Sequence, residues 1–425
     1  MSENRNSILE ENSSRRRFLG GTALTTMAAA LGLNIPYGRY FPEGLVPVAL
    51  GQDASTISET DLLAAKGGLR VLNDRPINAE TPAALLDEEI TPTERHFVRN
   101  NGLVPQRALT GSLDGWSLTI DGEVERRLTL TMNDLKSGFE MVRRAYVIEC
   151  GGNGRAGYHP PASGNQWTLG AVGCSLYEGV RLADVLKKAG LKDSGIYIGY
   201  YGEDIHLSRD PSKVVISRGV PIAKAMDEDT ILAWSMNGEP LPALHGFPLR
   251  LICPGWPGST SGKWLTRITV RDVVHDGPKM TGYSYRVPKY PVAPGTDVPE
   301  EDMQIIEAMP VKSMITFPES GLQIPVDQPL PLRGNAWSGL GDIAAMHVSL
   351  DFGQTWKETA LKKPRNRYAW QRWETGLKFP TPGYYEVWAR ATDQSRAMQP
   401  MVVPGWNPRG YLNNAMHRIA VKVTT

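Results

Sequence analysis

Apolar and polar residues alternate along four short stretches near the C-terminal end of the chain. Alternation of this kind is the pattern of a strand with one buried face. The stretches are residues 332–337, 346–350, 383–391 and 417–423. The segment Asp351-Phe352-Gly353-Gln354 adds a hairpin-turn signal. About 100 residues with this pattern of short alternating strands and turns predict an immunoglobulin-like sandwich, with Trp337, Trp356 and Trp388 in its core.

The preceding part of the chain carries a mixed pattern. A short helix is expected from Asp61 to Lys66, and a longer one from Leu182 to Ala189 that stops at Gly190, a typical cap. Strands are expected over residues 116–120, 196–201, 214–217, 249–253 and 265–274. The proline-rich, polar stretch 283–302 indicates a linker or a long arm. We therefore predict an α+β fold, with a mixed domain over residues 53–300 and an all-β sandwich over residues 301–425.

Composition changes this picture little. The chain has 425 residues, 41% hydrophobic content and a formal net charge of +1. These values fit a soluble globular protein of about two to three domains. They give no electrostatic reason to expect nucleic acid or a membrane surface as a partner.

The N-terminus has the pattern of an export signal. Ser14-Arg15-Arg16-Arg17-Phe18-Leu19 matches the twin-arginine motif, and the apolar run that follows is too short for a transmembrane span. We predict a leader over residues 1–52, a mature protein without a membrane span, and a periplasmic location. The alternative is a basic patch before an ordinary amphipathic segment.

The three cysteines cannot all pair with one another, so at least one is free. Cys174 and Cys253 are expected to be buried small hydrophobic residues. No Cys-x-x-Cys-His occurs, so we expect no haem attached to this chain. The glycine fingerprints of dinucleotide sites and P-loops are also missing from the sequence.

Cys150 is the cysteine with a distinctive setting. It follows the β-prone run 146–148 and precedes the glycine-rich segment Gly151-Gly152-Asn153-Gly154-Arg155. A thiolate is the ligand that soft transition metals select, and glycines let the backbone approach a bulky group closely. Arg155 is a permanent cation suited to an oxyanion. A cysteine that only packs in the core is the ordinary alternative.

Several segments together resemble the sulfite oxidase family of molybdenum enzymes. The segments are residues 149–155, 237–242, 245–250, 254–255 and 263–265, and they match in spacing as well as in residue type. The resemblance implies that the Cys150 thiolate ligates molybdenum carried by molybdopterin. It also implies that the C-terminal sandwich is a dimerisation domain.

The resemblance also implies two sets of site residues. The set expected to hold molybdopterin comprises Phe97, Val98, Arg99, Asn100, Asn101, Asp204, His245, Arg250, Ser261, Gly262 and Lys263. The loop around Asp204 matches least well. The set expected to surround a sulfur oxyanion comprises Arg99, Arg155, Arg409, Trp167 and Tyr285, with Tyr290 as the alternative tyrosine. Guanidinium groups hold such anions through charge-assisted hydrogen bonds, and a tyrosine can orient substrate or relay a proton.

Asn101 and the segment Cys150-Gly151-Gly152-Asn153 depart from the animal and plant enzymes and are more similar to the bacterial branch. That branch includes sulfane dehydrogenases and periplasmic sulfite dehydrogenases. We expect oxidation of protein-bound sulfane sulfur or of sulfite, with electrons passed to a separate c-type cytochrome. A sulfur-carrier protein is a further expected partner, and the assembly is a homodimer or a heterotetramer. The rival hypotheses are a sulfoxide reductase and a metal-free binding protein.

Overall fold

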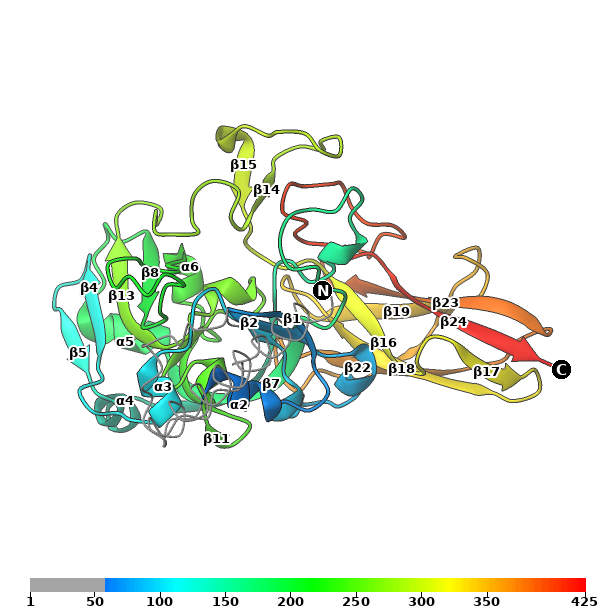
Figure 1. Cartoon of the computed structure of the whole chain (residues 1–425), viewed down its shortest axis with the longest axis horizontal. Coiled ribbons are helices and arrows are strands. Elements are labelled where there is room, and N and C mark those ends of the chain that lie inside the picture. The colour runs from blue at the N-terminus through cyan, green and yellow to red at the C-terminus, as the bar shows by residue number, and fades with distance from the viewer. Residues whose placement is uncertain (1–57) are drawn as a thin grey trace, which may run out of the picture. The chain divides into compact units, whose positions relative to one another are not determined.

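The computed structural model describes residues 58–425 (Figure 1). These residues form mostly strands, and the longest of the few α-helices there has eight residues. The predicted leader lies outside the described residues. Within residues 58–425, no helix is long and apolar enough to cross a membrane.

One sheet leads directly to Cys150. Its strands are β6 (Met141–Glu149), β7 (Val172–Arg181), β10 (Ile231–Met236), β11 (Glu239–Pro240) and β12 (Arg250–Ile252). Strand β6 pairs antiparallel with β7 along its whole length, from Met141 opposite Val180 to Glu149 opposite Val172. Because β6 ends at Glu149, this ladder fixes the backbone immediately before Cys150.

A second sheet lies beside the first and shares a core with it. Its strands are β4 (Leu118–Gly122), β5 (Leu128–Leu130), β8 (Tyr197–Gly202), β9 (Gly219–Pro221) and β13 (Leu265–Arg271). Helix α5 (Leu182–Ala189) buries Leu182, Val185 and Leu186 in this core. The helix ends where Gly190 adopts a left-handed φ of 75°, a conformation that glycine takes without a Cβ clash. The short helices α4 (Met132–Gly138) and α6 (Ile222–Ala225) complete this part of the fold.

The first described residues form a small unit next to these sheets. It comprises helix α2 (Glu59–Ala64), strands β1 (Arg70–Asp74), β2 (Ile77–Glu80) and β3 (Val98–Arg99), and helix α3 (Gln106–Thr110). Helix α2 begins with a capping box between Ser58 and Asp61. Strand β3 carries Arg99 to the site described below.

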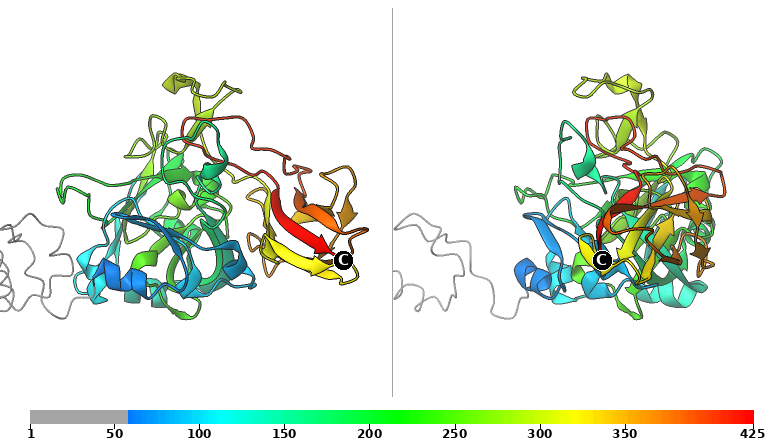
Figure 2. Two further views of the ribbon diagram at one scale, coloured as in Figure 1. Left: turned by 45° about the vertical axis from the view of Figure 1, so that its right-hand side comes forward. Right: turned by 90° about the vertical axis from the view of Figure 1, so that its right-hand side faces the viewer.

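The predicted linker is partly a hairpin arm. Strand β14 (Arg286–Pro288) pairs antiparallel with β15 (Met303–Ile305). The loop that joins them stands clear of the sheets in every view (Figures 1 and 2).

The C-terminal region is two sheets packed face to face. One has β16 (Lys312–Phe317), β18 (Leu330–Trp337), β21 (Ala360–Leu361) and β22 (Gln371–Leu377). The other has β17 (Leu322–Pro325), β19 (Ile343–Ser349), β20 (Lys357–Glu358), β23 (Gly383–Asp393) and β24 (His417–Thr424). Alternate residues of both sheets, such as Leu332, Val348 and Val421, meet in one apolar core. The predicted strands are therefore confirmed as β18, β19, β23 and β24, with the clearest alternation of burial along β24.

The expectations for one segment and for three tryptophans were wrong. Residues 214–217 form no strand, because Val215 and Ile216 pack against Tyr285 and Tyr411 instead of pairing in a sheet. Trp337 lies outside the sandwich core and packs with Trp370 against the strands that lead to Cys150. Trp356 and Trp388 are also outside that core.

Candidate functional site

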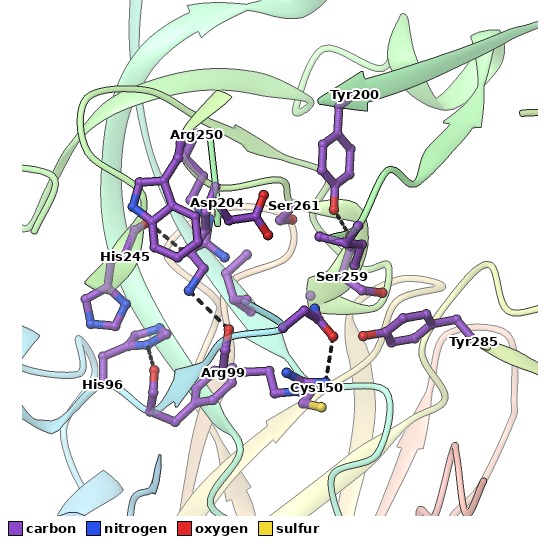
Figure 3. A pocket seen from close by; sticks show the side chains of 17 residues that line it. His96, Arg99, Cys150, Tyr200, Asp204, His245, Arg250, Ser259, Ser261 and Tyr285 are labelled. Atoms are coloured by element: carbon purple, nitrogen blue, oxygen red, sulfur yellow. Dashed lines mark hydrogen bonds between the residues drawn. The ribbon is translucent and has the colours of Figure 1, made fainter. Parts of the chain in front are cut away.

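Two pockets meet at Cys150. The histidine pocket is lined chiefly by His96, Arg99, Cys150, Asp204, His245, Arg250, Ser261, Lys263 and Tyr285 (Figure 3). The arginine pocket, a cavity of about 190 Å³, is lined chiefly by Arg99, Asn101, Cys150, Arg155, Asn165, Lys279, Tyr285, Arg409 and Tyr411. Cys150, Arg99, Asn101 and Tyr285 line both. A group bound to the thiol would therefore face both pockets.

The Cys150 loop is held from both sides. The Cys150 amide donates to the Ala171 carbonyl at 2.9 Å, and the Cys150 carbonyl accepts from the Asn153 amide at 2.8 Å. The neighbouring Glu149 carboxylate is buried and accepts from Lys312 Nζ at 2.6 Å and Trp337 Nε1 at 2.8 Å, both on strands of the C-terminal region. The sandwich thus fixes the start of the Cys150 loop.

Two glycines of this loop have separate roles, one beside Arg155 and one beside Asn413. A Cβ on Gly152 would overlap the Arg155 guanidinium. Gly154 has a left-handed φ of 93° and accepts from Asn413 Nδ2 at 2.7 Å through its carbonyl. The glycines are therefore required for the conformation of this loop and for the position of Arg155.

The histidine pocket gathers cations and neutral imidazoles. Burial lowers the pKa of Arg250 and, more strongly, that of Lys263. Burial, helped by the nearby Lys66 cation, lowers the pKa of His96 to about 3 and that of His245 well below its usual value. Lys66 Nζ lies 2.5 Å from His245 Nε2, and burial lowers the pKa of this lysine to about 7. The pocket concentrates positive charge that water does not solvate.

Several polar atoms of this pocket have no partner within the described chain. They are His96 Nε2, Asn100 Nδ2 and Arg250 Nε. Asp204 carries the one carboxylate among the described lining residues, and burial raises its pKa to about 6 against the opposing effect of Lys263. Buried donors without acceptors are costly, so the pocket is suited to an anionic ligand rich in acceptor atoms.

The arginine pocket is built differently. Arg155 Nε donates to the Arg409 carbonyl at 2.6 Å, and Arg155 Nη1 donates to the Asn165 carbonyl at 2.8 Å. Arg409 Nη1 donates to Ser163 Oγ at 2.6 Å, and Lys279 adds a further cation at the wall. None of the described residues lining this pocket is acidic. Its remaining donors can therefore hold an oxyanion.

Comparison with known proteins agrees with this chemistry. Residues 102–279 match the model of the oxidoreductase molybdopterin binding domain, and residues 303–424 match that of the Mo-co oxidoreductase dimerisation domain. Sulfite oxidase of Gallus gallus is 34% identical over 365 residues, which cover 83% of this chain and 77% of that protein. The chain belongs to the sulfite oxidase family.

Two further relatives show the range of this family. The NAD(P)H nitrate reductase of Hordeum vulgare is 30% identical over 381 residues, and the match spans 84% of this chain and 42% of that enzyme. The solved structure of sulfane dehydrogenase SoxCD from Paracoccus pantotrophus has a TM-score of 0.68 at 26% identity. That match covers 92% of this chain and 97% of the SoxCD chain.

The histidine pocket fits the molybdopterin that this family binds. Its unpartnered donors at Asn100 and Arg250 match the acceptor atoms of a phosphate and a pterin, and the unpartnered His96 Nε2 can accept a hydrogen bond. Within residues 58–425, no group of three or more His, Cys, Asp or Glu side chains could hold a metal ion.

The structure brings most of the predicted family residues together. Phe97, Arg99, Asn101, Asp204, His245, Arg250, Ser261, Lys263, Tyr285 and Cys150 line the histidine pocket, and Arg155 and Arg409 line the arginine pocket. Asn100 is buried and accepts from Lys263. Tyr290 is exposed and donates to Asp302 at 2.7 Å, away from both pockets, so Tyr285 is the tyrosine at the site.

Three predicted residues lie behind the pocket walls. Trp167 is completely buried, with its ring edge against Phe97 at a centroid distance of 6.5 Å. Val98 packs in the apolar cluster that also holds Trp264. Gly262 admits the ring of Tyr200, which a Cβ would displace. These residues shape the walls and do not face the cavities.

The structure adds residues that the sequence did not single out. His96 lines the histidine pocket, Lys66 contacts His245 from behind that pocket, and Lys279 and Tyr411 line the arginine pocket. His96 directly precedes Phe97, so its position beside a recognised motif was an available signal. Tyr411 offered a similar signal two residues after Arg409. No sequence signal pointed to Lys66, because it is 179 residues from its partner His245.

Proposed function

We propose that this protein is a periplasmic molybdopterin enzyme that oxidises a sulfur compound and passes the electrons to a separate c-type cytochrome. One observation carries the proposal. Cys150 lines both a cation-rich pocket suited to a pterin phosphate and an arginine-rich pocket suited to an oxyanion. A cofactor held in the first pocket would present its metal to a substrate in the second.

The histidine pocket would hold molybdopterin. Arg250 and Lys263 would offset the charge of its phosphate and His245 would contribute a hydrogen bond, while Phe97, Asn101 and Ser261 would contact its rings. The bound group would supply oxygen-atom transfer and accept two electrons, with the Cys150 thiolate as a protein ligand of the metal. The protein's share is then to bind, orient and exclude water.

The arginine pocket would hold the sulfur oxyanion. Arg155 has two of its donor nitrogens bound to backbone carbonyls, so its plane is fixed and Nη2 remains for the substrate. Arg99 and Arg409 would add charge from either side. Tyr285 would orient the substrate or relay a proton through its hydroxyl, which points toward the centre of the site (Figure 3).

We favour protein-bound sulfane sulfur as the substrate and keep free sulfite as the alternative. The likeness to SoxCD over nearly the whole of both chains supports the sulfane version. The sulfite version is supported by the identity to the Gallus gallus sulfite oxidase.

The remaining parts of the proposal concern assembly and location. The match of residues 303–424 to a dimerisation model supports an immunoglobulin-like sandwich that joins two copies or takes part in a heterotetramer with a cytochrome subunit. The Arg15-Arg16-Arg17 motif supports export of the folded protein by the twin-arginine route. We place the domain boundaries near residues 52 and 300.

The test is an assay of protein produced in a host that makes molybdopterin. Molybdenum and pterin contents near one per chain are expected, together with sulfur oxidation coupled to cytochrome c reduction. Strong activity on free sulfite without a sulfur carrier would select sulfite dehydrogenase. Turnover of methionine sulfoxide with a viologen donor, without sulfur oxidation, would select a reductase. Protein without molybdenum would reject every enzymatic reading.

A further inference from the structure

Four side chains beside Cys150 form a continuous stack. The Arg218 guanidinium lies over the Tyr285 ring at 4.6 Å from its centroid. The Tyr285 and Tyr411 rings are stacked, with centroids 5.5 Å apart and an interplanar angle of 17°. Arg155 lies over the Tyr411 ring at 5.3 Å. Tyr411 therefore touches both Arg155 and Tyr285.

The two ends of the stack have different surroundings. Arg218 is buried, donates to Ser259 Oγ at 2.7 Å and has no carboxylate in salt-bridge range within residues 58–425. Its charge is balanced mainly by aromatic faces, an interaction that strengthens when water is excluded. Arg155 stands in a slot in which a Cβ on Gly152, Gly164 or Gly410 would crowd its side chain.

The backbone of Tyr411 is fixed independently of its ring. Its amide donates to Asn407 Oδ1 at 2.9 Å, and its carbonyl accepts from the Tyr158 hydroxyl at 2.6 Å. The next amide, that of Leu412, donates to the Gly151 carbonyl at 3.0 Å. The segment that follows Arg409 thus holds Tyr411 rigidly against the Cys150 loop.

We propose that Tyr411 is a positioning residue of the arginine pocket. Its ring fixes the Arg155 guanidinium and the Tyr285 ring relative to each other, so that both address the same oxyanion. Arg218 fixes the opposite face of Tyr285. The inference rests on the proposed function, because it explains how the substrate-binding groups of the arginine pocket are held in position. Small displacements of substrate-binding groups lower the reaction rate by large factors. Because the Tyr411 ring makes both stacking contacts, we expect the ring to contribute more to the rate than its hydroxyl does.

The experiment compares Tyr411→Leu with the matched control Tyr411→Phe in the complete enzyme. Tyr411→Phe keeps the ring and should stay within about 2-fold of wild type in KM and kcat. Tyr411→Leu should raise KM by about 10-fold or more and also lower kcat, with unchanged molybdenum and pterin contents. Loss of activity in Tyr411→Phe equal to that in Tyr411→Leu would assign the role to the hydroxyl and overturn the proposal.

A second variant tests the other end of the stack. Arg218→Met removes a buried charge without a carboxylate partner, so it should fold, and it removes the contact with the Tyr285 ring together with the hydrogen bond to Ser259; unchanged molybdenum and pterin contents would show that the histidine pocket is intact. We expect kcat to fall by about 10-fold while KM changes by less than about 2-fold. If Arg218→Met leaves kcat unchanged, or raises KM as strongly as Tyr411→Leu does, the stack does not work as proposed.

Sulfate binding separates this inference from the proposed function. Calorimetry of sulfate on the folded wild type and variants needs no turnover. Tyr411→Leu should weaken sulfate binding about 10-fold, and Tyr411→Phe should not. If the wild type binds sulfate but oxidises no sulfur compound, the proposed function is wrong, while the positioning role of Tyr411 is still supported. Equal sulfate affinities in wild type and Tyr411→Leu, or no sulfate binding at all, would reject the stack.

Discussion

The two pockets that meet at Cys150 are both cationic, yet they are stabilised in opposite ways. In the histidine pocket, Arg250 and Lys263 are buried and lowered in pKa by burial, and Arg250 Nε has no partner in the described chain. In the arginine pocket, Arg155 is tied to two backbone carbonyls and Arg409 to a serine. The first pocket leaves a buried guanidinium nitrogen for a ligand, whereas hydrogen bonds within the chain already fix the arginines of the second.

The difference indicates what each pocket is built to do. A pocket that is unfavourable when empty favours tight, lasting retention of its ligand, as a cofactor requires. A pocket whose arginines are already fixed changes little between its free and bound states, which suits a substrate that enters and leaves. The contrast can be tested one residue at a time.

The largest effect is expected at the residue that both pockets share. Cys150→Ser replaces the soft thiolate with a hard hydroxyl, and turnover should fall by about 1,000-fold or more. Pterin content should remain close to wild type, because Arg250, His245 and Lys263 are intact. The measurements are sulfur-dependent cytochrome reduction and pterin fluorescence. Full activity in Cys150→Ser would remove the metal-ligand assignment.

Arg250→Met tests the histidine pocket. Pterin content of the purified protein should fall by about 10-fold, since a phosphate partner is lost. The melting temperature of cofactor-free protein should rise by about 2 °C, because a buried cation without a carboxylate partner has been removed. Pterin fluorescence and calorimetric melting measure the two quantities. A lower melting temperature would show that Arg250 is already compensated, and the contrast between the pockets would fail.

Arg155→Met tests the arginine pocket and should give the reverse pattern. KM should rise by about 30-fold with pterin content unchanged. Stability should fall by about 1–3 kcal/mol, because the Arg409 and Asn165 carbonyls lose their donors. Arg155→Lys is the matched control. It keeps the positive charge but loses the planar guanidinium, so it should restore only part of the substrate binding and of the stability. Arg155→Met with normal KM would exclude this arginine from substrate binding.

Local sequence predicted the parts of this site that depend on local geometry. The cysteine, the glycines and Arg155 lie within six consecutive residues at the end of one strand, and their roles follow from backbone conformation and charge. The strands β18, β19, β23 and β24 were predicted correctly for the same reason. Family resemblance supplied the distant members, such as His245 and Arg409.

The remainder depends on contacts that no local pattern encodes. Trp337 alternates like a sandwich residue, yet its indole donates to Glu149, 188 residues earlier. Val215 and Ile216 have the pattern of a strand and instead pack beneath Tyr285. Tyr411 is unremarkable in sequence until folding places it between Arg155 and Tyr285. Such residues become visible only when tertiary packing is known.

The smallest expected effect on turnover is that of Lys66, behind the histidine pocket, whose substitution changes the pH dependence of the stability of the cofactor-free protein. Burial lowers the pKa of Lys66 from 10.5 to about 7. Between these values the unfolded chain holds a proton that the folded chain lacks, so stability rises with pH; below pH 7 both states are protonated and the full penalty applies. Lys66→Met should therefore be more stable than wild type at pH 6, with an advantage that shrinks by pH 9.

Melting temperatures of cofactor-free wild type and Lys66→Met across this pH range measure the effect. The control is Lys213→Met, at an exposed lysine whose side chain is 56% accessible, and its difference from wild type should not vary with pH. The melting temperature of cofactor-loaded wild type should rise less steeply with pH, because an anion in the pocket lined by His245, the neighbour of Lys66, favours the protonated amine in the folded state. A constant difference between Lys66→Met and wild type at all pH values would mean that Lys66 is solvated. The Lys66 ammonium would then add no uncompensated charge to the histidine pocket.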